Sequence, residues 1–100
     1  MSIAEECRED YVGLWSVLTE VRATVSDKSL AIEATLHLIK RLLLEADVVA
    51  GQFHSGKFKR WEMPVDAIIA KIQRQWAELG RDPGLGDVVW FTAQEEIRGN

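Results

Sequence analysis

The chain has 100 residues, a formal net charge of -4 and an apolar content of 47%. This length suits one domain, and the apolar content suffices for a folded core, so disorder is not expected. Acids outnumber bases by 16 to 12, which disfavours nucleic acid as a partner because phosphate binding normally needs a basic excess.

The first half of the chain predicts two helices. Ser2 can cap a first turn that holds Glu5 and Glu6. Gly13 marks either close packing or a break, and we expect the main helix over about 10–25. A second helix is expected over about 28–47. The first helix is indicated by apolar residues at steps of four and three: Cys7, Tyr11, Leu14, Leu18, Val21 and Val25.

A β-hairpin is predicted over Val48–Met63, with its turn at Ser55–Gly56. This register pairs Phe53 with Phe58. One face then carries Val48, Ala50, Trp61 and Met63, and the other carries the two phenylalanines with Arg60 nearby.

A third helix is expected after Pro64 and is expected to end at Gly80. The glycine-rich residues 80–87 indicate a turn, because a phosphate-binding loop would need a different motif. Residues 88–92 predict the third strand of the sheet. The fold class is therefore α+β: two N-terminal helices, a hairpin, a third helix and a C-terminal strand in a three-stranded, mainly antiparallel sheet. One domain spans 1–100, with flexible ends at about 1–6 and 95–100.

The residues that carry chemistry form no recognisable catalytic or metal-binding set. Cys7, His37 and His54 are far apart in sequence, and Cys7 is the only cysteine. A packed Cys7 and surface histidines are expected. We therefore predict a non-enzymatic protein without cofactor or metal. A lone thiol, the lack of a signal peptide and the lack of a membrane-spanning segment favour the cytoplasm.

Two segments are candidates for interaction. The hairpin gathers basic and aromatic side chains: Phe53, Lys57, Phe58, Lys59, Arg60 and Trp61. Its lysines have an alternative explanation, the protection of an edge strand from aggregation. The N-terminal segment carries the acids Glu5, Glu6, Glu9 and Asp10. The apolar face of the first helix, with Leu14, Trp15 and Leu18, offers the simplest surface for a homodimer.

A hairpin that follows a helix resembles the wing of the winged-helix family. The resemblance implies a wing at Gln52–Arg60, a preceding recognition helix at Leu30–Ala46, and contact with DNA. This chain departs from the family, because that helix has only Lys40 and Arg41 as basic groups and a further helix follows the wing.

The closing segment, residues 76–93, resembles that of small bacterial proteins with no assigned function. In size and charge the chain is also similar to immunity proteins, which cover the basic active site of a toxin. The leading hypothesis is a protein-protein interaction domain, either of the immunity type or homodimeric. The alternative is a winged-helix-like nucleic-acid-binding regulator.

Overall fold

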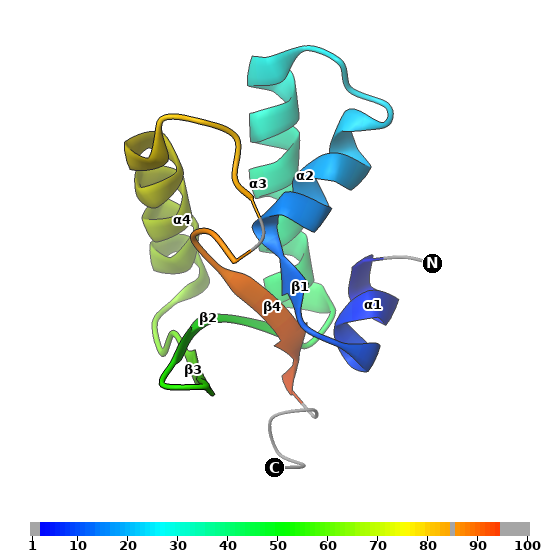
Figure 1. Ribbon diagram of the computed structural model, residues 1–100. Coiled ribbons are helices and arrows are strands. Elements are labelled where there is room, and N and C mark those ends of the chain that lie inside the picture. Colours follow the sequence, from blue (N-terminus) through cyan, green and yellow to red (C-terminus); the bar gives the residue numbers. More distant parts are fainter. Residues whose placement is uncertain (1–2, 85, 95–100) are drawn as a thin grey trace.

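Four helices and four strands make up the computed structural model, which describes residues 3–84 and 86–94 (Figure 1). These elements confirm the predicted α+β class. In chain order they are α1 (Ile3–Glu9), β1 (Val12–Gly13), α2 (Leu14–Arg22), α3 (Lys28–Glu45), β2 (Val48–His54), β3 (Lys57–Arg60), α4 (Val65–Leu79) and β4 (Trp90–Ala93).

The sheet has one strand more than predicted. Its order is β1-β4-β2-β3, and each neighbouring pair is antiparallel. The additional strand is β1, where Val12 pairs with Phe91 and Gly13 pairs with Trp90. It interrupts the helix expected over about 10–25, so that α2 begins only at Leu14. Glycine is about 1 kcal/mol less favourable than alanine inside a helix, so interrupting the helix at Gly13 costs little free energy.

Residues near the N-terminus form the helix α1, although a flexible end was expected over about 1–6. The helix α1 begins at Ile3, whose side chain is buried, as is that of Cys7. Residues 95–100, the other expected flexible end, lie outside the described residues.

The second predicted helix is confirmed as α3, and the helix expected after Pro64 is confirmed as α4. The carboxylate of Asp27 accepts a hydrogen bond from the Leu30 amide (3.0 Å) and caps α3. The helix α4 begins directly after Pro64. It ends at Gly80, which has a φ of 71° in the left-handed region that glycine tolerates.

The hairpin of β2 and β3 has the predicted register. Phe53 pairs with Phe58, and the turn residues Ser55 and Gly56 have φ values of 53° and 78°. Two successive positive φ values define the type I′ turn, whose twist matches that of the flanking strands.

The hairpin predicted over Val48–Met63 is too long at its C-terminal end. The strand β3 ends at Arg60, and Val48 pairs with Ala93 of β4 instead of with Met63. Met63 is exposed, because the chain leaves the sheet there and turns into α4.

Side-chain alternation divides the sheet into two faces. Val12, Ala50 and Phe91 point into the core that α2, α3 and α4 cover. The opposite face carries Trp90 and Thr92 of β4, and α1 packs on part of it. Figure 1 shows α1 beside β1 and β4, with α4 on the other side of the molecule.

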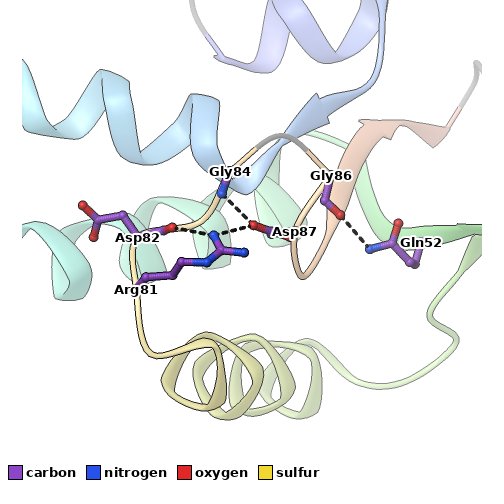
Figure 2. A network of polar contacts seen from close by, with 6 residues as sticks. All are labelled: Gln52, Arg81, Asp82, Gly84, Gly86 and Asp87. Carbon is purple, nitrogen blue, oxygen red and sulfur yellow. Dashed lines mark hydrogen bonds and ion pairs between the residues drawn. The ribbon is translucent and has the colours of Figure 1, made fainter.

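The loop between α4 and β4 is held by a polar network (Figure 2). The Asp87 carboxylate accepts hydrogen bonds from the Arg81 guanidinium (2.9 Å) and the Gly84 amide (2.8 Å). The Gln52 side-chain amide donates to the Gly86 carbonyl (3.4 Å), which joins the loop to β2. The predicted turn is confirmed.

The strand β4 begins at Trp90, two residues later than predicted, because the backbone turns at Val88. This residue has a φ of 69°, which a β-branched side chain rarely adopts. The Val89 amide donates to the Asp87 carbonyl (2.8 Å) and closes a three-residue turn.

Candidate interaction surface

Four aromatic rings meet on the sheet face opposite α3. We call this group the aromatic patch: Tyr11 before β1, Phe53 of β2, Phe58 of β3 and Trp90 of β4. The ring centroid of Phe53 lies 4.9 Å from that of Tyr11, 5.6 Å from that of Phe58 and 5.8 Å from that of Trp90. Tyr11 and Phe58 are 5.1 Å apart. These are the separations at which aromatic rings attract one another, so the patch is a packed unit.

Two glycines lie beneath these rings on the sheet, and one of them, Gly51, makes room for a ring. A Cβ on Gly51 would lie 2.8 Å from the Phe58 ring and would also overlap the Lys59 carbonyl. A Cβ on Gly13 would meet the Trp90 ring at 3.6 Å, an ordinary contact. Phe58 therefore lies close over the backbone of Gly51, which only glycine permits.

The aromatic patch is partly open to solvent. Phe53 is 36% exposed, and the other three side chains are half-buried. The helix α1 covers a neighbouring part of the same face, where the Thr92 hydroxyl donates a hydrogen bond to the Cys7 carbonyl (3.3 Å). A group of contacting aromatic side chains at the surface is typical of protein interfaces.

Basic side chains lie along one side of the patch. Lys57, Lys59 and Arg60 of β3 are exposed, and none of them forms an ion pair within the described part of the chain. Alternation places Arg60 on the face of Phe58, whereas the two lysines point to the opposite face. We call β3 the basic edge.

Acidic side chains lie on the other side, next to Tyr11. Glu6 and Glu9 of α1 and the adjoining Asp10 line a hollow of about 240 Å³ together with Tyr11, Val12 and Ser16. The Asp10 carboxylate accepts a hydrogen bond from the Tyr11 amide (2.7 Å), which fixes the start of β1. Glu5 is exposed on α1 but does not line this hollow. We call Glu6, Glu9 and Asp10 the acidic edge.

The other predicted interaction residues lie apart from the patch. Trp61 packs partly buried against the core, and the Lys71 ammonium lies 4.4 Å from its ring centroid. Trp15 of α2 is 48% exposed. The homodimer surface predicted at Leu14, Trp15 and Leu18 is wrong, because Leu14 and Leu18 are buried in the core.

The thiol is buried, whereas the two histidines are exposed on other elements. Cys7 is buried, and burial together with the charge of Glu6 raises the pKa of its thiol to about 12. His37 and His54 are exposed on α3 and β2, as expected. In the described ranges, no group of three or more His, Cys, Asp or Glu side chains is placed to hold a metal ion.

The helix predicted as a recognition helix has its basic groups paired. The Lys40 ammonium lies 3.2 Å from the Asp66 carboxylate, and the Arg41 guanidinium lies 3.0 Å from the Glu45 carboxylate. Each of these cations already has a carboxylate partner, which reduces its net attraction for phosphate.

Two members of the patch, Tyr11 and Trp90, were not among the predicted site residues. Tyr11 fitted the periodicity of a core-facing helix, and Trp90 lay in a strand expected to be buried. The signal for Trp90 was the alternation in residues 89–92, which places Val89 and Phe91 in the core and Trp90 on the other face.

Comparison with protein-family models, curated proteins and solved structures finds no match for the chain. Between residues 3 and 94, leaving out 85, no helix is long and apolar enough to cross a membrane.

Proposed function

We propose that this chain is a non-enzymatic domain that binds a protein partner, either another protein or a second copy of itself, through the aromatic patch. The observation that carries the proposal is the contact between four aromatic rings from different segments on a partly exposed face. Burial of aromatic side chains gives interfaces much of their free energy, and a packed group loses little conformational entropy when a partner covers it.

The charged edges support this proposal. Arg60 stands on one side of the patch, and the acidic edge stands on the other. A polar, charged rim around an apolar centre is the usual composition of a protein interface. The immunity-type version of the proposal uses the acidic edge, which would face a basic toxin and speed its association.

The non-enzymatic part of the proposal is supported by Cys7. A thiol with a pKa of about 12 has very little thiolate at neutral pH, so it is a poor nucleophile. Its burial fits a structural role, and a lone reduced thiol fits the cytoplasm, where we place the protein.

A second candidate is a nucleic-acid-binding regulator of the winged-helix type. One observation favours it: within the described residues, α1, α2 and α3 precede the hairpin, and three helices precede the wing in that family. The ion pairs of Lys40 and Arg41 and the net charge of -4 favour the protein-binding proposal instead.

The proposal is tested by site-specific photo-crosslinking in the cells that naturally make the protein. A photoreactive phenylalanine derivative replaces Phe53 in one variant and Trp15 in another, since both positions are exposed and aromatic. We expect a covalent protein adduct from position 53 and none from position 15. The proposal is wrong if position 53 gives no protein adduct while the variant is folded and photoreactive.

A further inference from the structure

We infer that the partner at the aromatic patch is a second copy of this chain, related by a two-fold axis. This inference rests on the proposed function and names the partner. In the dimer, the patches of the two copies face each other, and Arg60 of each copy meets the acidic edge of the other.

The placement of charge across the sheet carries the inference. The strand order puts β1 at one side of the sheet and β3 at the other. The acidic edge adjoins β1 through Tyr11, and the basic edge is β3 itself. Opposite charges therefore flank the patch on opposite sides.

A two-fold dimer needs a surface that is complementary to itself, because the same residues meet from both copies. A rotation about an axis that runs along the strands, in the plane between two facing sheets, exchanges the two sides of the patch. The β3 side of one copy then faces the β1 side of the other, so both charge contacts are attractive. A surface with one sign of charge on both sides would repel its copy.

Arg60 suits the hollow at the acidic edge. It is exposed, it shares a face with Phe58, and it forms no ion pair within the described residues. The hollow of about 240 Å³ is lined by the acidic residues Glu6, Glu9 and Asp10 together with Tyr11, Val12 and Ser16. Small-molecule pockets usually begin at about 300 Å³, so the hollow suits one inserted side chain better than a ligand of that kind.

An arginine gains two kinds of contact in such a place. Its planar guanidinium pairs with a carboxylate through two hydrogen bonds, and it stacks on an aromatic ring. With two copies of this contact per dimer, a change in one residue type affects the interface twice.

A charge exchange between two variants tests the inference. The changes are Arg60→Glu in one variant and Glu9→Arg in the other, measured by sedimentation equilibrium up to about 100 micromolar. We expect the natural chain to dimerise and each variant alone to dimerise at least about tenfold more weakly, because like charges then meet at both contacts. An equal mixture of the two variants should recover dimers, since both contacts between unlike copies are again attractive.

Matched controls carry the same charge changes elsewhere. Arg74→Glu on α4 and Glu33→Arg on α3 alter exposed residues outside the patch, and their mixture should behave as each variant alone does. Thermal unfolding checks that the variants are folded. Glu9→Arg adds a cation to the last turn of α1, which the helix dipole favours. If Arg60→Glu does not fold, Arg60→Gln takes its place in the test. We expect Arg60→Gln to weaken the dimer less than Arg60→Glu.

The result that overturns the inference differs from the one that overturns the proposed function. A monomeric natural chain, or a mixture that fails to recover dimers, overturns the two-fold dimer. If the crosslink from position 53 then contains a different protein, the proposed function stands. A crosslink that contains a second copy, together with recovery in the mixture, supports the inference.

Discussion

Cys7 shows at the scale of one residue how the fold changes chemistry. Burial and the neighbouring Glu6 raise the pKa of its thiol from the ordinary 9.0 to about 12. The unfolded chain therefore loses this proton at a lower pH than the folded chain does. The contribution of the neutral thiol to stability is fully present below pH 9.0 and is lost as the pH rises toward about 12.

We predict that the difference in stability between the natural chain and the Cys7→Ala variant depends on pH. At neutral pH we expect the variant to be less stable by about 1 kcal/mol, because a buried side chain is made smaller. That difference should shrink as the pH is raised above 9.0, since only the natural chain loses the contribution of the thiol. Urea unfolding of both proteins across this pH range measures it. Parallel pH profiles for the two proteins would show that Cys7 titrates normally.

Gly51 matters at the scale of the element, because three strands meet around it. It pairs with Arg60 of β3 and Trp90 of β4. A Cβ at this position would lie 2.8 Å from the Arg60 Cα, besides its overlap with the Lys59 carbonyl and the Phe58 ring. Backbone atoms cannot move aside as a flexible side chain can, so β3 would have to shift away from β2.

We predict that Gly51→Ala lowers the free energy of unfolding by about 2 kcal/mol, within the usual cost of overpacking. The variant should also disturb the aromatic patch, because Phe58 loses its place over the glycine. Gly13→Ala is the matched control, since its Cβ meets only the Trp90 ring at an ordinary distance. Chemical unfolding and near-ultraviolet circular dichroism measure both effects. Equal stability of the two variants would contradict the close packing at Gly51.

The elements that the sequence predicted are those with a local cause. Ser55–Gly56 determined the hairpin register, and Pro64 and Gly80 bounded α4. The strand β1 has two residues and no periodicity of its own, so only its pairing with β4 reveals it. Cys7, Tyr11 and Leu14 have the spacing of one helical face, although they lie in α1, in the segment before β1 and in α2. This spacing therefore predicted one continuous helix.

The candidate site was predicted in part for the same reason. The hairpin register alone placed Phe53, Phe58 and Arg60 on one face. Tyr11 and Trp90 reach that face through strands that are distant in sequence, and the acidic edge is brought to Tyr11 by the turn at Asp10. Contacts of this kind depend on sheet order, which local spacing does not determine.

At the scale of the whole molecule, the net charge and the local charges favour different partners. A chain of net charge -4 repels a polyanion at long range. The basic edge is a local exception, in which only Arg60 shares a face with the aromatic patch. Edge protection accounts for the two lysines, whose side chains point away from the patch.

This balance predicts that the protein does not bind duplex DNA. In a gel-retardation assay at low salt, random duplex DNA should show no shift with the protein at tens of micromolar, where even non-specific binders of DNA give one. The paired Lys40 and Arg41 lead to the same expectation for α3. A salt-sensitive shift that Lys57→Glu abolishes would contradict this prediction. It would assign the basic edge to phosphate binding, and the nucleic-acid-binding proposal would then replace the protein-binding one.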